Sequence, residues 1–115
     1  MELIIDQYVT LHQGITADEG KKIYNKIITS FKNGEVVVLN FENLELLTTA
    51  FLNVVIGNLY AKYSSEEIKK MLVLKGYSES IAMRIKNVTD TAKQFYANKK
   101  KFRNRINNNN VNELY

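Results

Sequence analysis

Short runs of β-forming residues alternate along this chain with longer segments of helical periodicity. The clearest run, residues 35–41, reads Glu-Val-Val-Val-Leu-Asn-Phe, and similar runs occupy residues 3–11, with a bend near Asp6, and 71–74. A short, continuous β-branched run is typical of a buried strand that is covered on both faces of a parallel sheet. Strands that alternate with helices pair in parallel through right-handed crossovers. We therefore expect one α/β domain in the order β-α-β-α-β-α, with a mostly parallel sheet backed by helices.

The helical segments between these runs begin at recognisable caps. Residues 16–19 have the Thr-x-x-Glu spacing of a capping box, and Asn-Gly at residues 33–34 ends that helix. Thr48 and Thr49 can cap the strongly apolar helix that follows them. A second capping-box spacing, Ser-x-x-Glu at residues 64–67, predicts a short helical turn.

The last helix is the longest segment of regular periodicity. Ser78 can cap it, and apolar residues recur along it at alternating intervals of four and three, which predicts one helix over residues 78–104. This length exceeds what a small core requires, so we expect the distal third to protrude or to meet another chain, as in a homodimer. We assign residues 1–106 to a single domain and the Asn-rich residues 107–115 to a flexible tail.

Composition excludes several classes of protein. The chain has no cysteine, which removes disulfides, thiolate catalysis and Cys-based metal sites. No apolar run approaches the roughly 20 residues that span a bilayer. The N-terminus lacks the basic region of a signal peptide. These features predict a cytoplasmic protein that does not enter a membrane.

Positive charge is concentrated at the C-terminal end. Residues 1–92 hold ten Lys or Arg against eleven Asp or Glu, whereas residues 93–115 hold six against one. The densest cluster is Lys99, Lys100, Lys101, Arg103 and Arg105. A nucleic-acid-binding role for this cluster, with Tyr96 and Phe102 available to stack on bases, is one alternative. The other is a basic helix end that the helix dipole favours.

Recognisable catalytic and metal-binding motifs are lacking. His12 is the only histidine, and no cysteine or acidic cluster lies near it in sequence, so we expect it to be solvated. Glu42 and Glu45 flank a loop at the end of the second strand, where open α/β sheets place their sites, but two loop carboxylates are more often solvated surface. Phosphate-binding glycine motifs, the G-x-S-x-G nucleophile motif and H-E-x-x-H are all absent from the sequence. We expect no enzymatic activity, no metal and no cofactor.

The segment from residue 36 to residue 52 is the most informative. It predicts a buried strand, a short loop, the pair Thr48 and Thr49, and then an apolar helix. Free amides at such a helix start would tolerate a phosphate on either threonine. The alternative is plain N-capping by threonine.

This segment resembles the STAS family, and most closely the bacterial STAS-like domain of unknown function (the DUF4325 group). The resemblance spans roughly residues 12–98, and it depends on the order of several short motifs. These motifs are Thr-Ala-Phe-Leu-Asn at 49–53, Ile-Gly-Asn-Leu-Tyr at 56–60, Tyr-Ser-Ser-Glu-Glu-Ile-Lys at 63–69 and Asp-Thr-Ala-Lys at 90–93.

In STAS domains, a strand is followed by an acidic residue, a phosphorylated Ser or Thr and a glycine. Against that pattern Asn40 stands at the strand end, Thr48 replaces the acidic residue, Thr49 replaces the phosphoacceptor and Phe51 replaces the glycine. The resemblance implies a non-enzymatic regulator whose partner contacts include these four residues and Glu42. It also implies a protein partner, such as a histidine-kinase-like ATPase that phosphorylates Thr49. Two departures from the pattern are the missing acidic residue and the bulky Phe51, which we expect to pack inward.

Overall fold

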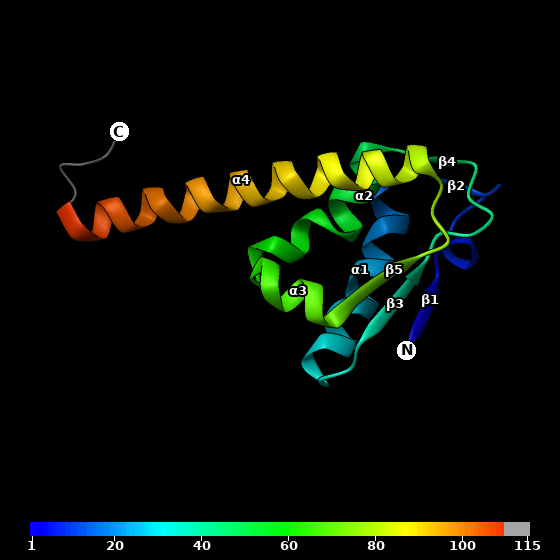
Figure 1. The fold of residues 1–115 in the computed structure, drawn as a ribbon, viewed down its shortest axis with the longest axis horizontal. Coiled ribbons are helices and arrows are strands. Elements are labelled where there is room, and N and C mark those ends of the chain that lie inside the picture. The colour runs from blue at the N-terminus through cyan, green and yellow to red at the C-terminus, as the bar shows by residue number, and fades with distance from the viewer. Residues whose placement is uncertain (110–115) are drawn as a thin grey trace.

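The computed structural model describes the backbone of residues 1–109 and the side chains of residues 1–97 (Figure 1). In chain order the elements are β1 (Glu2–Ile4), 3-10 helix η1 (Ile5–Tyr8), β2 (Gln13–Gly14), α1 (Ala17–Lys32), β3 (Val37–Asn40), β4 (Leu46–Leu47), α2 (Thr49–Val55), 3-10 helix η2 (Gly57–Ala61), α3 (Ser65–Met71), β5 (Leu72–Lys75) and α4 (Glu79–Asn109). The predicted α/β class with parallel strands and a long last helix is confirmed.

Three strands form the main sheet in the order β1-β3-β5, and both pairings are parallel. Leu3 lies beside Leu39, and Leu39 lies beside Leu74, so these side chains share the face of the sheet that packs against the helices. A second, two-stranded parallel ladder joins β2 to β4 at one end of the molecule. This small ladder leads directly into α2.

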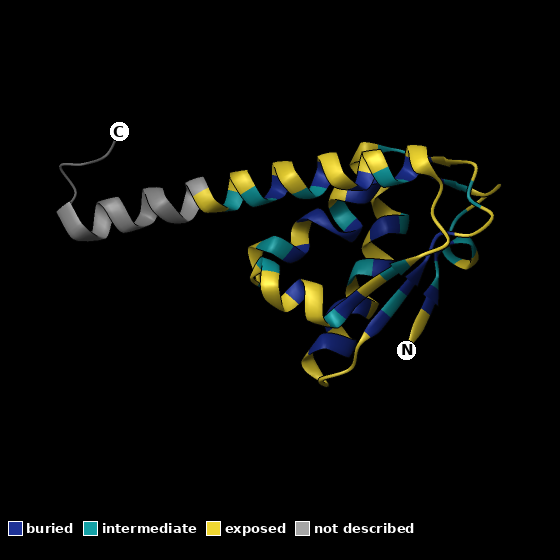
Figure 2. Ribbon diagram, viewed as in Figure 1, coloured by how far each residue is buried: buried dark blue, intermediate teal, exposed yellow. Residues whose placement is uncertain are grey.

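The helices lie on one face of the three-stranded sheet (Figure 1). Burial alternates along the strands accordingly: Val37 and Leu39 are fully buried, whereas Val36 and Val73 remain 46% exposed on the other face (Figure 2). The prediction that the strand at residues 35–41 is covered on both faces is therefore wrong within the described chain. The sequence misled because β-branched residues occupy both faces of this strand, and only one face reaches the core.

The strand predicted at residues 3–11 is confirmed only at Leu3 and Ile4, which lie in β1, and is wrong for residues 5–11. β3 ends at Asn40, which pairs with Ile4, so residues after Ile4 have no strand to pair with. The chain instead forms η1, which buries Ile5 completely. It then reverses in a tight turn at residues 10–13 before β2. Tertiary pairing thus overrides the β propensity of this segment.

α1 begins and ends at the predicted residues. The Thr16 hydroxyl accepts a hydrogen bond from the Glu19 amide (3.2 Å), and Gly34 follows the helix with φ +74°. Near its start, α1 approaches α2 closely: a Cβ on Gly20 would lie 3.2 Å from the Phe51 carbonyl oxygen. This contact fixes the position of α2 against the rest of the core.

α4 packs on the other helices through its first half and continues past them (Figure 1). The Ser78 hydroxyl accepts from the Ile81 amide (3.3 Å), and the stripe that contains Ile85 and Val88 is buried. The helix runs to Asn109, five residues beyond the predicted end at position 104. The remainder of the predicted tail, residues 110–115, lies outside the described residues.

Candidate functional site

The start of α2 is held in place by the β2–β4 ladder. The Thr48 amide donates to the Gly14 carbonyl (3.0 Å), and the Thr48 hydroxyl donates to the Ile15 carbonyl (3.1 Å). Gly14 is required at this point, because a Cβ there would lie 2.5 Å from the Leu47 side chain and 2.9 Å from the Phe51 ring. The ladder and the helix start therefore form one unit.

Thr48 and Thr49 have different surroundings. The half-buried Thr48 is the N-cap of α2: its hydroxyl accepts from the Phe51 amide (3.1 Å) while donating to Ile15. Thr49, the first residue of the helix, is exposed, and its hydroxyl makes no hydrogen bond within the described part of the chain. Only Thr49 therefore presents a free hydroxyl at this helix start.

Asn40 and Phe51 support the site from inside the fold. Asn40 is 5% exposed; its amide nitrogen donates to Glu2 (2.8 Å) and its amide oxygen accepts from the Glu42 backbone (2.9 Å). Phe51 is fully buried, as predicted from its size. Neither side chain can contact a partner directly in this structure, whereas the exposed Glu42 can.

A local network of charges joins Glu2, the first residue of β1, to the last residues of β3 and β5. Lys75 pairs with Glu2 (3.1 Å), which also accepts the hydrogen bond from Asn40. The Asn40 amide and then Lys75 lower the pKa of the Glu2 carboxyl below its ordinary value. This network links the ends of β1, β3 and β5.

A strained turn at residues 10–13 lies beside the helix start. Leu11 and His12 both have positive φ (54° and 59°), and the Gln13 amide donates to the Thr10 carbonyl (3.0 Å). Two such residues are typical of a type I′ turn, which normally takes Asn or Gly. Two contacts hold the turn in this conformation: His12 Nδ1 lies 2.8 Å from Asp6 Oδ1, and the His12 carbonyl accepts a hydrogen bond from an amide of the β3–β4 loop. His12 is thus exposed but paired, which the sequence did not indicate.

The segments that lead into α2 carry exposed apolar side chains. Leu11 is 76% exposed at the tip of the strained turn, and Leu46 and Ile15 follow along the ladder at 41% and 42%. We call Leu11, Ile15, Leu46 and Thr49 the turn surface. Sequence reasoning missed the three apolar residues because their periodicity is that of strand interiors. The structure shows instead that they lie on short strands and turns at the rim.

The turn surface lies among acidic residues. Segments 10–19 and 40–50, which build this end of the molecule, contain four carboxylates and no Lys or Arg: Asp18, Glu19, Glu42 and Glu45. No group of three or more potential metal ligands occurs within the residues that the structure describes. The exposed apolar side chains of the turn surface suit contact with another molecule.

The predicted cationic cluster lies on the far part of α4. The backbone of Lys99, Lys100, Lys101, Arg103 and Arg105 is helical, but their side chains lie outside the described residues. Among the helices of the described chain, none is both long and apolar enough to cross a bilayer. The basic cluster and the turn surface are on opposite sides of the body (Figure 1).

Comparison with known proteins finds one family. The sequence profile of the STAS-like domain of unknown function (DUF4325) matches residues 19–82, more than half of the chain. The match runs from α1 through the start of α2 to the beginning of α4, and so includes Thr48 and Thr49. No curated protein and no solved structure matches the chain. The chain therefore belongs to the family of STAS-like domains of unknown function (DUF4325).

Proposed function

We propose that this protein is a non-enzymatic regulator that binds a protein partner through the turn surface and is switched by phosphorylation of Thr49. The observation that carries the proposal is the contrast between the two threonines. Thr48 uses its hydroxyl as both donor and acceptor within the fold, whereas Thr49 is exposed and its hydroxyl makes no hydrogen bond within the described part of the chain. A kinase can therefore reach Thr49 without disturbing the helix cap.

The surroundings of Thr49 set the expected sign of the switch. A phosphate at the first position of α2 is compatible with the folded protein, because free amides and the helix dipole favour negative charge there. On the partner-facing side, the same phosphate has to be desolvated beside Leu46 and Ile15 and near Glu45. Phosphate in an apolar interface or next to carboxylates disrupts binding. We therefore expect phosphorylation to release the partner.

The family resemblance suggests what the partner is. In the antagonist branch of STAS domains, the kinase is a histidine-kinase-like ATPase that is also the binding partner. We propose a partner of this class, whose contact surface would bury Leu11 as its main apolar anchor. Leu11 suits that role because its strained backbone is held by hydrogen bonds on both sides of the turn. An anchor that is ordered before binding loses little entropy when it docks.

The test is a comparison of Thr49→Glu with Thr91→Glu. Thr91 is an exposed threonine of α4 far from the turn surface, so it controls for the added charge. The partner is captured from the native host with wild-type protein, purified and titrated against each variant by calorimetry. We expect Thr49→Glu to weaken binding at least tenfold, about 1.4 kcal/mol, and Thr91→Glu to bind as wild type does. Equal affinity of Thr49→Glu and wild type would contradict the switch.

A further inference from the structure

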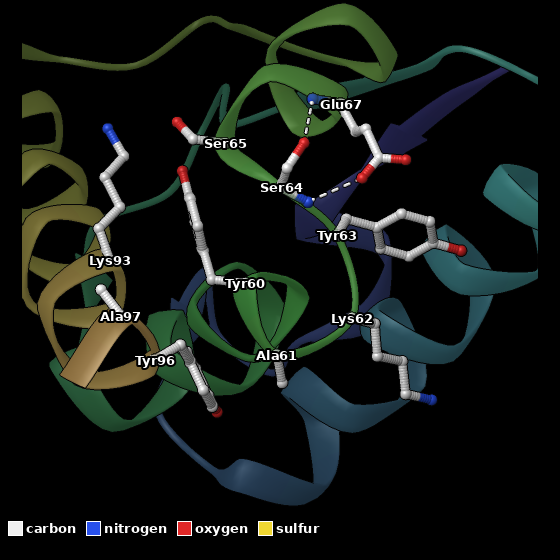
Figure 3. A pocket seen from close by; sticks show the side chains of 10 residues that line it. All are labelled: Tyr60, Ala61, Lys62, Tyr63, Ser64, Ser65, Glu67, Lys93, Tyr96 and Ala97. Carbon is white, nitrogen blue, oxygen red and sulfur yellow. Dashed lines mark hydrogen bonds between the residues drawn. The ribbon is translucent and has the colours of Figure 1, made fainter. Parts of the chain in front are cut away.

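A groove separates the η2–α3 segment from the middle of α4, on the side of the body away from the turn surface (Figure 3). Its volume is about 780 Å³. Tyrosine, lysine and serine side chains dominate its walls. The lining includes Tyr60, Tyr63, Ser64, Glu67, Lys93 and Tyr96. A groove with this lining is polar at its rim and aromatic in its walls.

The aromatic side chains are arranged on two facing elements. Tyr60 comes from η2, and Lys93 extends beside it from α4 (Figure 3). Tyr96 follows Lys93 by three residues on the same helix, so the two lie on one face of α4. Tyr63 packs edge-on against the buried Phe31, with ring centroids 5.2 Å apart. Tyr60 and Tyr96 are half-buried, which leaves part of each ring open to a ligand.

The charges around the groove favour a negative ligand. Glu67 is occupied in the capping box with Ser64, in which its carboxylate accepts from the Ser64 amide (2.9 Å) and lies on the Tyr63 side (Figure 3). Asp90, one turn before Lys93, is paired with Lys86 (3.1 Å). Lys93 itself makes no ion pair within the described part of the chain. The cation that faces the groove is therefore not neutralised.

The phenol of Tyr60 remains a neutral donor at ordinary pH. Burial raises the pKa of Tyr60, and the nearby Asp90 carboxylate raises it further. The Tyr60 hydroxyl can donate to an oxygen of a base or phosphate. A neutral ring also avoids the repulsion that a phenolate would exert on a phosphate.

The same helix carries the cationic cluster beyond the groove. Residues 99–105 contain five Lys or Arg, and they begin six positions after Lys93. At a helical rise of about 1.5 Å per residue, Lys93 and Arg105 are separated by about 18 Å along α4. This length can accompany several phosphates of an extended strand. Aromatic walls beside a cationic track are the combination that single-stranded nucleic acid uses.

The Tyr60 and Tyr96 side chains extend in opposite directions from η2 and α4 (Figure 3), so each can stack on a different base. We propose that the groove binds single-stranded nucleic acid, with one base on Tyr60 and another on Tyr96, while the strand follows the cationic part of α4. An acidic peptide would be attracted to the same cations, but its carboxylate side chains would not stack on the exposed tyrosine rings as bases do. The site is independent of the proposed partner site. Either can exist without the other, because they lie in different parts of the body.

The experiment measures fluorescence anisotropy of a labelled twelve-nucleotide oligo(U) with the full chain at low salt. We expect Tyr60→Ala and Tyr96→Ala each to weaken binding at least fivefold, and Lys93→Glu at least tenfold. Two matched controls should bind as wild type does: Tyr77→Ala, an exposed tyrosine that precedes α4, and Lys21→Glu, an exposed lysine of α1. Affinity should also fall with rising salt, since each phosphate contact contributes about −0.7 to the logarithmic slope.

Three results would overturn the proposal. The first is an absence of oligo(U) binding at low salt by the wild-type chain. The second is unchanged affinity of both tyrosine variants in folded protein, as checked by circular dichroism, which would leave the groove unused. The third is equal competition by poly-glutamate at matched charge, which would assign the groove and helix to an acidic peptide.

Discussion

The start of α2 and the η2–α3 segment below α4 lie in different parts of the body (Figure 1). The second segment lines the groove, and the two sites are built in different ways. At the start of α2, segments distant in sequence meet through backbone hydrogen bonds, such as that from the Thr48 amide to the Gly14 carbonyl. At the groove, η2 and α4 are also distant in sequence, but there the two elements meet through side chains. The first end is acidic and apolar, and the second is aromatic and leads to a basic helix.

Because of this difference, the two ends should respond differently to substitution. At the start of α2, backbone hydrogen bonds and the close contact at Gly14 hold the ladder and the helix together, so an added atom inside this unit disturbs all of it. The exposed Thr49 can be modified without such a disturbance. Where side chains line an open groove, substitutions alter the ligand site and leave the fold intact.

The largest effect should come from removing the ring of Phe51. This side chain is fully buried and lies against Gly14, so Phe51→Ala leaves a cavity beneath the ladder. We expect the free energy of unfolding to fall by about 3–5 kcal/mol. Urea denaturation followed by circular dichroism measures it. The matched control is Phe95→Ala, since Phe95 is 57% exposed on α4; we expect a change within about 0.5 kcal/mol. Similar losses in the two variants would remove the contrast between the ends.

Adding a single methyl group at Gly14 should have the next largest effect. Its Cβ would meet the Leu47 side chain at 2.5 Å, so Gly14→Ala forces either the ladder or α2 to move. We expect a loss of about 1–3 kcal/mol, as for other overpacked sites. Gly57→Ala is the control, because its Cβ would come closest to the end of the exposed Asn53 side chain, at 3.2 Å, and would meet Val88 at an ordinary contact distance of 3.6 Å. A Gly14→Ala protein as stable as wild type would show that the ladder is not rigidly coupled to α2.

The smallest effect concerns the acid titration of Glu2. Its pKa is lowered from the ordinary 4.5 by the Asn40 amide and Lys75. A lowered carboxyl pKa stabilises the folded state above pH 4.5, and this contribution is lost as the pH falls below 4.5 through the folded-state pKa. Melting temperatures measured from pH 6 to pH 3 should therefore fall less steeply in Glu2→Gln than in wild type. Identical slopes would mean that the network at the sheet edge adds no pH dependence.

Much of the fold could be predicted from local signals. The caps at Thr16, Thr48 and Ser64 lie where their spacing predicts them, because each depends on residues within one turn. The end of the first strand could not be predicted, since it is set by the length of β3, its partner in the sheet. The uncovered face of the sheet was missed for a similar reason: β-branched residues on two faces look alike in sequence whether or not a second layer of helices exists.

The candidate site was predicted in part. The sequence pointed to the Thr48–Thr49 helix start, and the structure distinguishes the two threonines by their hydrogen bonds. The positive φ angles of Leu11 and His12 carry little sequence signal, because leucine rarely adopts that conformation and histidine, although enriched in it, adopts it in a minority of cases. The groove beside α4 depends on how η2 packs against that helix, which no local pattern specifies.

The most direct test of the account is to titrate the captured protein partner with wild type, Thr49→Glu and Tyr96→Ala side by side. Thr49→Glu alters only the turn surface, and Tyr96→Ala alters only the groove. The account predicts at least a tenfold loss of partner affinity in Thr49→Glu and unchanged affinity in Tyr96→Ala. Unchanged affinity in Thr49→Glu, or a comparable loss in Tyr96→Ala, would contradict a partner site at the start of α2.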